Sequence, residues 1–307
     1  YAALEAARGG TKTKFAKTGA AVVIDVRNGD ILAMSSYPSF DLNLFTGGIS
    51  EEDYAAINDE ETTPMFNKAI SSRAEPGSTF KMVTGYAALQ EGVITPNTTI
   101  SCEGEYRENV VRGKGPKCWT KNPSSHSNQT VVEGLKNSCN YFFYDVGRRT
   151  GIDTLVEYAQ KFGLGQSTGI ELPERTGAVG SPARSEELGQ TWYEGNVLNV
   201  AIGQDNTQVT PLQLANYIAT LVNGGTRYAA HLLKEVKSSD FSQVLYTYEP
   251  EVLSTIDIQP ENLEAVKAGM LALTTTGSVA SAFRDLPVQV GAKTGSAQVS
   301  AQTESNA

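Results

Sequence analysis

Short apolar runs bounded by turn residues open and close the chain, whereas its middle carries apolar residues at helical spacing. Residues 20–26 predict a buried strand, and the Asn28-Gly29 pair after it is typical of a tight hairpin turn. Residues 31–36 predict the second strand of this hairpin. After Pro287, residues 288–292 predict a last strand that can lie beside it. Strands at both ends with helices between them indicate an α+β domain.

The clearest helical pattern begins at Ser78. Apolar residues within Phe80–Ala88 return with the helical period, and Gly92 supplies a stop. Residues 95–129, in contrast, show little periodicity. A segment of this length without regular structure is usually functional or held by cross-links.

Two capping boxes predict the starts of further helices. Thr130 with Glu133, and Thr210 with Gln213, have the residue types that satisfy the first backbone N–H groups of a helix. Other helices are predicted over residues 141–149, 153–162 and 261–273.

Composition limits the possible functions. The 307 residues are 40% hydrophobic, enough for one large domain or two ordinary ones with a sizeable core. Basic residues number 25 and acidic residues 34, so the net charge is -9. This sign argues against nucleic acid as a partner, because a polyanion is held by cationic side chains. No stretch reaches the roughly 18 apolar residues that span a bilayer.

The scarcity of histidine directs the search to serine paired with lysine. With His126 and His231 as the only histidines, a Ser-His-Asp triad has few ways to form. Ser78 and Lys81 share one face of the predicted helix. A buried lysine near other cations can lose its proton and activate the serine, and the helix N-terminus favours an oxyanion. The alternative is a serine cap beside a solvated lysine, which is favoured for so short a motif taken alone.

Two further motifs change that balance. Ser138-Cys139-Asn140 lies between two predicted helices, and Lys293-Thr294-Gly295 lies on the predicted last strand. A hydroxyl that passes a proton, an amide that holds a peptide, and a lysine and threonine that face a carboxylate are complementary parts. Each motif alone also fits a plain turn or a polar strand. All three in this order indicate one site.

With these motifs the chain resembles the transpeptidase domain of class B penicillin-binding proteins, and the resemblance runs from Ala20 to Ala297. It is closest to the elongation-type and spore-type members. It implies a penicillin-binding-protein/β-lactamase-like transpeptidase fold, an antiparallel sheet flanked by helices with an all-helical lobe. The resemblance also includes Tyr37-Pro38-Ser39-Phe40-Asp41-Leu42-Asn43, Pro76-Gly77-Ser78-Thr79-Phe80-Lys81, Cys118-Trp119, Ile202-Gly203-Gln204 and Thr210-Pro211-Leu212-Gln213.

The resemblance implies a serine D,D-transpeptidase that cross-links peptidoglycan stem peptides and is inhibited by β-lactams. Ser78 would be the acylated nucleophile, Lys81 its base and Ser138 the proton shuttle. No cofactor is needed for this chemistry. A glycosyltransferase in the membrane is the implied partner, and the implied location is the extracytoplasmic face of the bacterial membrane, anchored by a segment absent from this chain.

The same resemblance assigns the substrate contacts. Asn140 would hold the amide of the donor stem, and Lys293 and Thr294 would receive its terminal carboxylate. Gly295 would leave room for the substrate beside the backbone. The backbone N–H groups of the nucleophile and of Ser296 would form the oxyanion hole.

Some features depart from the family pattern. Ser296 stands where threonine is commoner, and Asp205 where glycine is usual. Only 12 residues follow Gly295 (307 minus 295), whereas the family's domain continues with strands and a closing helix. We therefore expect residues 1–307 to be one transpeptidase domain that lacks its C-terminal strands and helix, with the N-terminal anchor and pedestal also absent.

Two alternative functions remain open. A β-lactamase shares the motifs but needs a water-activating glutamate. Glu171 and Glu174 are the candidates, and their surroundings resemble the Thr-Gly-Ile-Glu-Leu-Pro stretch of penicillin-binding proteins, which favours a surface loop. The other alternative is a non-catalytic β-lactam sensor or muropeptide scaffold.

All three cysteines and one histidine fall within residues 102–139. Cys102, Cys118, His126 and Cys139 suit one tetrahedral structural zinc ion, although their spacing matches no short zinc-finger signature. Ligand residues at similar places in some elongation-type relatives support zinc as a resemblance. The alternatives are a Cys102–Cys118 disulfide, as in many exported domains, and free thiols.

Overall fold

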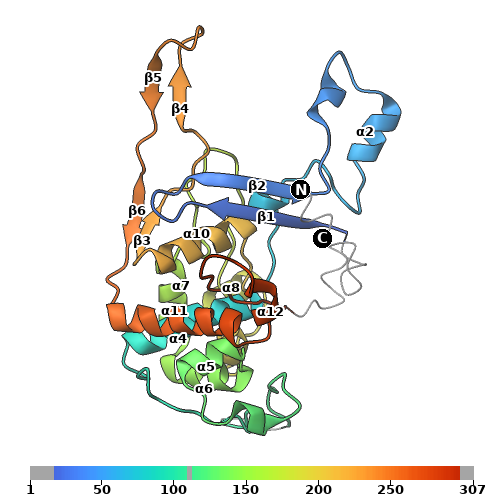
Figure 1. Cartoon of the computed structure of the whole chain (residues 1–307). Coiled ribbons are helices and arrows are strands. Elements are labelled where there is room, and N and C mark those ends of the chain that lie inside the picture. Colours follow the sequence, from blue (N-terminus) through green and yellow to red (C-terminus); the bar gives the residue numbers. More distant parts are fainter. Residues whose placement is uncertain (1–16, 109–112, 298–307) are drawn as a thin grey trace.

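The computed structural model describes residues 17–108 and 113–297, so the outermost parts of the predicted 1–307 domain lie outside the described residues. Figure 1 shows an antiparallel hairpin of strands lying against a larger lobe of helices. The predicted α+β class is therefore confirmed. The helices bury one large apolar cluster, and the hairpin covers a second, smaller one.

The described elements are mostly short helices. The strands are β1 (Gly19–Ile24), β2 (Ile31–Tyr37), β3 (Thr226–Tyr228), β4 (Glu235–Lys237), β5 (Val244–Thr247) and β6 (Val252–Thr255). The α-helices are α2 (Glu51–Ile57), α3 (Lys68–Ser71), α4 (Lys81–Gln90), α5 (Val131–Lys136), α6 (Asn140–Thr150), α7 (Ile152–Lys161), α8 (Pro182–Glu187), α9 (Asn196–Val200), α10 (Pro211–Val222), α11 (Pro260–Thr275) and α12 (Ala280–Phe283). Three 3-10 turns are η1 (Leu42–Phe45), η2 (Gly77–Phe80) and η3 (Pro123–His126).

The predicted N-terminal hairpin is confirmed, because β1 pairs antiparallel with β2 along its whole length. Gly29 in the turn takes a φ of +87°, and a Cβ there would stand 2.2 Å from the carbonyl oxygen of Ala229. The turn therefore requires glycine. One face of the hairpin packs on α3 and α10 through Ala20, Val22, Ile24, Ile31 and Met34.

Helix α4 is the centre of the helical lobe. Every residue from Lys81 to Leu89 is buried, and α5, α6, α7 and α11 pack around the helix. A helix enclosed on all sides is mostly apolar, and each large apolar side chain that it buries contributes about 1.5–3 kcal/mol. The buried polar exceptions in α4 are Lys81 and Thr84. The helix predicted from Ser78 is confirmed with one refinement. Its first turn is the 3-10 turn η2, and α-helical hydrogen bonding begins at Lys81.

Both predicted capping boxes are confirmed. Thr130 and Glu133 satisfy each other's backbone N–H groups at the start of α5, and Thr210 and Gln213 do so at the start of α10. The helices predicted over residues 141–149, 153–162 and 261–273 correspond to α6, α7 and α11.

The predicted strand over residues 288–292 is wrong. This segment lies along α11, where the Ala292 N–H donates to the Met270 carbonyl (3.1 Å) and the Thr274 hydroxyl donates to the Val290 carbonyl. A strand forms only where its backbone groups find a ladder partner, and here the helix takes those groups. Among the described strands, β1 pairs only with β2, so no C-terminal strand lies beside the hairpin.

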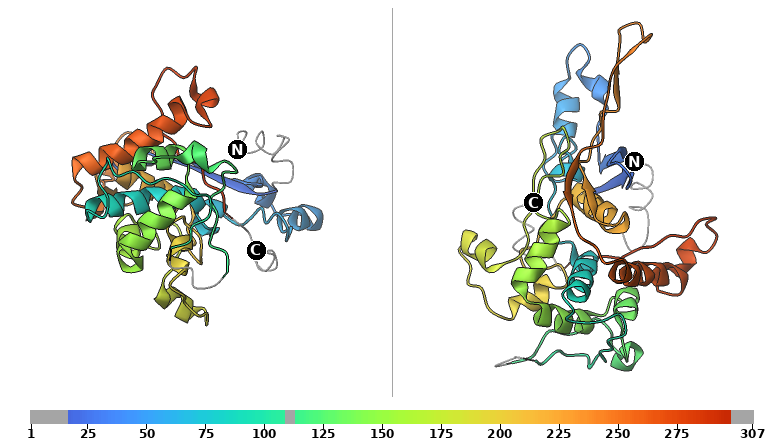
Figure 2. Two further views of the ribbon diagram at one scale, coloured as in Figure 1. Left: turned by 90° about the horizontal axis from the view of Figure 1, so that it is seen from below. Right: turned by 90° about the vertical axis from the view of Figure 1, so that its left-hand side faces the viewer.

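Two extensions project from the body, and the pattern analysis did not find them. The β4–β5 ribbon and the segment that carries α2 extend to the same side, as the right-hand view of Figure 2 shows. Within the predicted irregular segment 95–129, the described residues (95–108 and 113–129) contain only η3 and isolated bridges. No helix within the described ranges is long and apolar enough to cross a bilayer.

Candidate active site

The turn η2 places Ser78 at the start of the buried helix. Gly77 takes a φ of +53°, and its N–H donates to the Gly203 carbonyl at 2.9 Å. Both glycines are required, because a Cβ on Gly203 would stand 2.2 Å from the Gly77 carbonyl oxygen. Ser78 itself is half-buried, and its hydroxyl makes no hydrogen bond to any described residue. The turn thus presents a serine hydroxyl that is free to react.

Lys81 lies one turn further on and is fully buried. Its Nζ donates to the Ser138 carbonyl (2.9 Å), the Ser138 Oγ (3.2 Å) and the Asn140 Oδ1 (2.5 Å). Burial, followed by the charge of Lys293, lowers the pKa of Lys81 to about 7. A large fraction of Lys81 is therefore neutral at neutral pH and able to accept a proton.

The expected contact between Ser78 and Lys81 is not a hydrogen bond in this structure. All three hydrogen bonds of the Lys81 ammonium go to Ser138 and Asn140. Hydrogen bonds of a catalytic site are often long without substrate and tighten when it binds. The shared helix face still places the two side chains in the same site.

Ser138 bridges two lysines. It lies between α5 and α6 with a φ of +50°, a left-handed conformation that costs a residue with a side chain about 1 kcal/mol or more. Its Oγ lies 3.2 Å from the Lys81 Nζ and accepts a hydrogen bond from the Lys293 Nζ at 3.0 Å. The strained backbone aims this hydroxyl at both amines, as a proton relay requires.

The Lys293–Ser296 segment lies against the nucleophile turn, although it is not a strand. A Cβ on Gly295 would stand 2.9 Å from the Pro76 carbonyl oxygen, and a Cβ on Gly77 would stand 2.4 Å from the Ser296 carbonyl oxygen. Only glycine permits this approach of two backbones. Burial lowers the pKa of Lys293 to about 8. This amine therefore keeps most of its charge at neutral pH.

A cavity of about 840 Å³ connects the three motifs. Ser78, Ser138, Asn140, Thr294 and Ser296 all line it. The structure therefore brings together the residues that the sequence predicted for the site. Other lining residues were not assigned to the site from the sequence. Lys136, Asn137, Ser278 and Ala297 come from positions whose local pattern gives no functional signal, whereas Trp119, Ile202 and Gln204 belong to motifs of the family resemblance.

Trp119 ties the cavity to the irregular segment. Its indole N–H donates to the carbonyls of Asn137 (3.2 Å) and Ser138 (3.0 Å), while 63% of the residue stays exposed. Its ring also packs edge-on against His126. An aromatic face held in this way offers an apolar surface beside the nucleophile. The Cys118-Trp119 pair of the family resemblance was the one signal that pointed to it.

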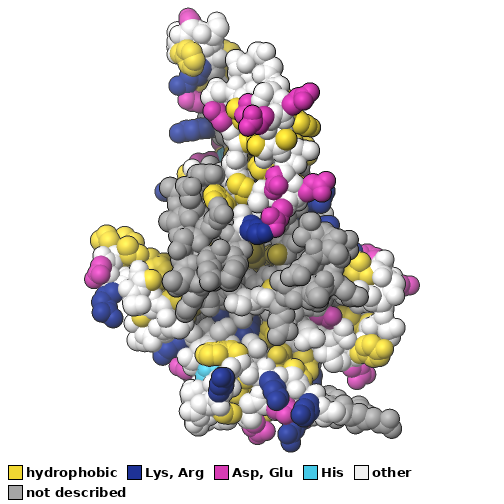
Figure 3. Space-filling model, turned by 90° about the vertical axis from the view of Figure 1, so that its right-hand side faces the viewer, with side chains coloured by type: hydrophobic (Ala, Val, Ile, Leu, Met, Phe, Trp, Pro, Cys, Tyr) yellow, Lys and Arg dark blue, Asp and Glu magenta, His cyan; other side chains and the backbone are white. Residues whose placement is uncertain are grey.

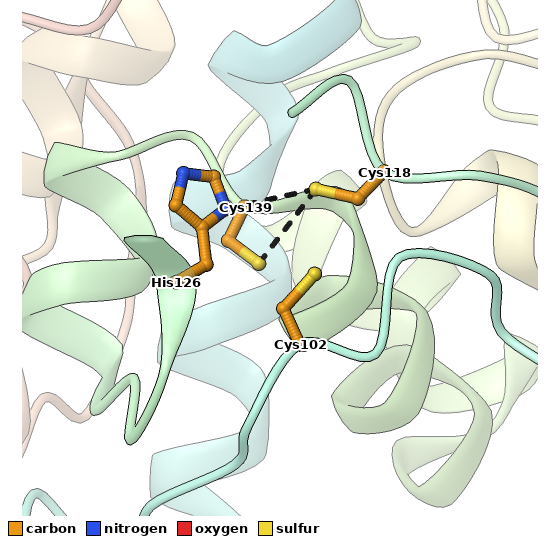
Figure 4. A group of neighbouring side chains, drawn as sticks. All are labelled: Cys102, Cys118, His126 and Cys139. Atoms are coloured by element: carbon orange, nitrogen blue, oxygen red, sulfur yellow. Dashed lines mark hydrogen bonds between the residues drawn. The ribbon is translucent and has the colours of Figure 1, made fainter. Parts of the chain in front are cut away.

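The four predicted metal ligands come together in one cluster (Figure 4), and His126 also lines the cavity. The ligand atoms of Cys102, Cys118, His126 and Cys139 all lie within 4.8 Å of one another, and all four residues are buried. The Cys118 Sγ lies 3.7 Å from the His126 Nδ1 and 3.9 Å from the Cys139 Sγ. The cysteines are free thiols, so the alternative Cys102–Cys118 disulfide is not formed.

The electrostatics of this cluster favour a thiolate at Cys118. The Cys139 thiol, the backbone N–H groups of Thr120 and Tyr141, and the His126 side chain lower the pKa of Cys118 well below its ordinary value. The Cys118 sulfur, followed by burial, instead raises the pKa of Cys139. Three sulfurs packed this closely bring several negative charges together when ionised, and a cation between them would offset that repulsion.

The glutamates of the β-lactamase alternative have structural partners. The Glu171 carboxylate accepts hydrogen bonds from the backbone N–H groups of Leu232 and Leu233. The Glu174 carboxylate accepts from the Thr168 N–H at 2.7 Å. Neither lines the 840 Å³ cavity. Both therefore hold loops in place, as the surface-loop interpretation predicted.

A lobe of helices packs on a strand hairpin, and Ser-Lys, Ser-Asn and Lys-Thr pairs meet around one cavity. This combination defines the class of serine-type penicillin-recognising proteins. Within that class the chain belongs to the family described as "Penicillin binding protein transpeptidase domain", which matches residues 19–307. The predicted family and fold are confirmed.

Relatives and solved structures agree with this membership. The chain is 36% identical over 297 residues to the "Peptidoglycan D,D-transpeptidase MrdA" of Escherichia coli K12, covering 94% of this chain and 46% of that relative. It is similar to the complex between penicillin-binding protein PBP2 and MreC from Helicobacter pylori, with a TM-score of 0.78, 28% identity and coverage of 92% and 50%. It is also similar to the imipenem acyl-enzyme of penicillin-binding protein A from M. tuberculosis, with a TM-score of 0.79, 27% identity and coverage of 91% and 62%. The chain thus spans about half the length of the curated relative.

Proposed function

We propose that this chain is the catalytic domain of a serine D,D-transpeptidase that cross-links peptidoglycan stem peptides and is acylated by β-lactams. The observation that carries the proposal is Lys81, a fully buried lysine with a pKa lowered to about 7 that is hydrogen-bonded to Ser138 beside the Ser78 turn. The imipenem acyl-enzyme of the mycobacterial relative and the printed name of the Escherichia coli relative support it.

In the acylation step, the Ser78 Oγ attacks the carbonyl of the penultimate D-Ala of a stem. The neutral amine of Lys81 takes the serine proton. The N–H groups of Ser78 and Ser296 receive the oxyanion. When the tetrahedral intermediate collapses, the bond to the terminal D-Ala breaks, and the proton passes through the Ser138 hydroxyl to the leaving amine.

The substrate is held from two sides. Lys293 and the Thr294 hydroxyl receive the terminal carboxylate of the stem, which β-lactams mimic with their own carboxylate. The Asn140 Oδ1 is occupied by Lys81, which leaves the Asn140 amide N–H₂ to donate to a stem carbonyl. Gly295 contributes indirectly, because its missing side chain lets this segment lie against the Pro76 carbonyl of the nucleophile turn.

An amine of a neighbouring strand completes the reaction. It attacks the acyl-enzyme carbonyl, gives its proton to the site, forms the new amide and releases the Ser78 hydroxyl. A β-lactam leaves a ring-opened acyl group that such amines do not displace readily. This difference makes the drug an inhibitor and the stem a substrate.

We expect acylation to depend on pH through Lys81. The base is the neutral amine, and its pKa is lowered to about 7. The acylation rate constant should therefore rise about tenfold per pH unit below pH 7 and level off above it. Stopped-flow acylation by a fluorescent penicillin between pH 5.5 and 8.5 measures this. A rate that falls as pH rises through this range contradicts the assigned base.

The lifetime of the β-lactam adduct separates this proposal from a β-lactamase. Because Glu171 and Glu174 hold loops and no glutamate or aspartate among the described residues lines the cavity, water is poorly activated there. We expect deacylation slower than about 10⁻³ s⁻¹, a barrier of about 21 kcal/mol. Intact-mass spectrometry of the penicilloyl adduct over time checks this. Turnover of a chromogenic β-lactam many times per second would establish the β-lactamase instead.

A transpeptidation assay separates the proposal from a non-catalytic sensor. An active domain should join a stem pentapeptide to an acceptor amine and release one D-Ala per cross-link. A sensor should take up the β-lactam but release no D-Ala. For the parent protein we propose a location on the extracytoplasmic face of the membrane and a glycosyltransferase partner. The Helicobacter pylori protein in complex with MreC supports assembly of this kind.

We further propose that Cys102, Cys118, His126 and Cys139 hold one structural zinc ion. Sulfurs around tetrahedral zinc lie about 3.8 Å apart, as follows from Zn–S bonds of about 2.3 Å. The Cys118–Cys139 and Cys118–His126 separations of 3.9 and 3.7 Å match this size. When bound, the ion would supply no reacting group. The ligands would fix Cys139, and with it the strained backbone of Ser138.

A further inference from the structure

Lys136 is a lysine of the active-site cavity that the proposed mechanism does not use. It is the last residue of α5, two positions before Ser138, and it is half-buried in the wall of the cavity. Its ammonium makes no ion pair and donates no hydrogen bond to any residue within 17–108 or 113–297. The Lys136 ammonium has therefore lost part of its contact with water, and no described protein group replaces the lost hydrogen bonds.

The charge of the cavity points to the kind of ligand that would pair with this lysine. The described lining contains Lys136 but no aspartate or glutamate, and Lys81 and Lys293 both donate to the Ser138 hydroxyl, which lines the cavity. The chain as a whole carries a net charge of -9. On the face that Figure 3 shows, acidic and basic side chains are interspersed over both the upper extension and the lower lobe. The cavity therefore suits a ligand with more than one negative charge.

The mechanism accounts for only one such charge. Lys293 and Thr294 are assigned to the terminal carboxylate of the stem, and Lys81 acts as the base. We propose that Lys136 receives a second carboxylate of the donor stem, carried by a residue that precedes the D-Ala-D-Ala end. This inference rests on the proposed function and names its substrate as a stem with a free side carboxylate rather than a carboxamide.

Two stem residues can supply that carboxylate. One is the γ-linked glutamate, whose α-carboxylate is free, and the other is a diamino-dicarboxylic acid with an unlinked carboxylate. The shared chemistry is a carboxylate on the α5 side of the cavity. The bound stem would then be held at its end by the Thr294 segment and along its length by Lys136.

If Lys136 only stabilised α5, its replacement would have a different measurable effect. A lysine in the last turn of a helix interacts with the helix dipole, and this is worth roughly 0.3–1 kcal/mol to stability. Such a role changes the melting temperature of a variant but not its choice between substrates. A test must therefore compare substrates in the same variant.

The test uses three synthetic stem pentapeptides: the free acid, the form amidated at the glutamate, and the form amidated at the diamino acid. Each competes with a fluorescent penicillin for acylation of the wild-type chain. We expect one amidation to weaken competition about tenfold, the size of one charged hydrogen bond. The ratio between competition by the free-acid stem and competition by the amidated stem should fall to near one in Lys136→Gln. In Lys136→Arg this ratio should stay near ten. Lys121→Gln removes the same charge from an exposed position outside the cavity and should leave the ratio unchanged.

Each outcome is decisive. A tenfold preference that survives Lys136→Gln, no preference in the wild-type chain, or a lower melting temperature as the only change would overturn the assignment of Lys136. Acylation by penicillin would be intact in all three cases, so the proposed function would stand. If penicillin itself does not acylate the wild-type chain, the proposed function fails and takes this inference with it.

Discussion

Replacing Ser78 with alanine should abolish acylation by β-lactams and by stem peptides. The hydroxyl is the atom that forms the covalent bond, and removal of a serine nucleophile costs about 10⁴-fold or more in rate. Intact-mass spectrometry should show one β-lactam mass on the wild-type chain and none on Ser78→Ala. The melting temperature should hardly change, because this hydroxyl makes no hydrogen bond to a described residue.

A second serine of the same cavity provides the matched control. Ser278 also lines the cavity but belongs to none of the three motifs. Ser278→Ala should therefore be acylated at a rate within a few-fold of the wild type. If Ser78→Ala still gained one β-lactam mass while remaining folded, another residue would be the nucleophile, and the peptide that carries the adduct would identify it.

The sequence was informative where a feature depends on neighbours along the chain. The capping boxes at Thr130 and Thr210 need only residues within a few positions, and both formed as predicted. The predicted hairpin also formed, although its loop spans residues 25–30 and a Cβ on Gly29 would meet the distant Ala229 carbonyl. The three catalytic motifs were predicted to meet because they resemble a family. Periodicity alone does not bring Lys293 to Ser138 across 155 positions.

Features that depend on distant partners were missed or wrong. The apolar pattern of residues 288–292 fits a strand, but the carbonyl of Met270 and the side chain of Thr274 take its backbone groups. The β4–β5 ribbon was missed for a similar reason. Its pairing depends on contacts between the two strands, and its turn lacks the Asn-Gly pair that marks a tight hairpin.

Backbone strain was also beyond the reach of the sequence. Ser138 carries a φ of +50° that nothing in its motif predicts. Asp205, where glycine is usual in the family, carries a φ of +62°, which shows why glycine suits that position. Strained residues of this kind gather at functional sites, where the surrounding structure maintains them.

Protein purified without added zinc should contain about one zinc ion per chain, and Cys102→Ser should lose it. The three cysteines and His126 meet within 4.8 Å, and no disulfide competes for the thiols. Loss of the metal removes the tie between the irregular segment and the start of α6. We expect unfolding free energy to fall by several kcal/mol, and the melting temperature by roughly 10 °C. Elemental analysis and a thermal melt measure the two effects.

The two histidines supply a matched pair of variants. His126→Gln should lose the metal, whereas His231→Gln should keep it, because His231 pairs with Asp30 far from the cluster along the chain. His231→Gln can lower stability by breaking that pair, so metal content is the measurement that decides. Metal content far below one equivalent in the wild type, or a Cys102–Cys118 cross-link in its peptide map, rules the zinc site out.

Loss of the metal should also slow acylation, because the metal ligands support residues of the cavity. Cys139 stands between Ser138 and Asn140, and the Trp119 indole holds the Ser138 carbonyl while packing on His126. When the cluster loosens, the Ser138 hydroxyl loses the support that keeps it at 3.2 Å from the Lys81 Nζ. We expect Cys102→Ser to acylate about tenfold or more slowly at a temperature where it is still folded. Unchanged acylation by a folded, metal-free variant would mean that the cluster stabilises the lobe without positioning Ser138.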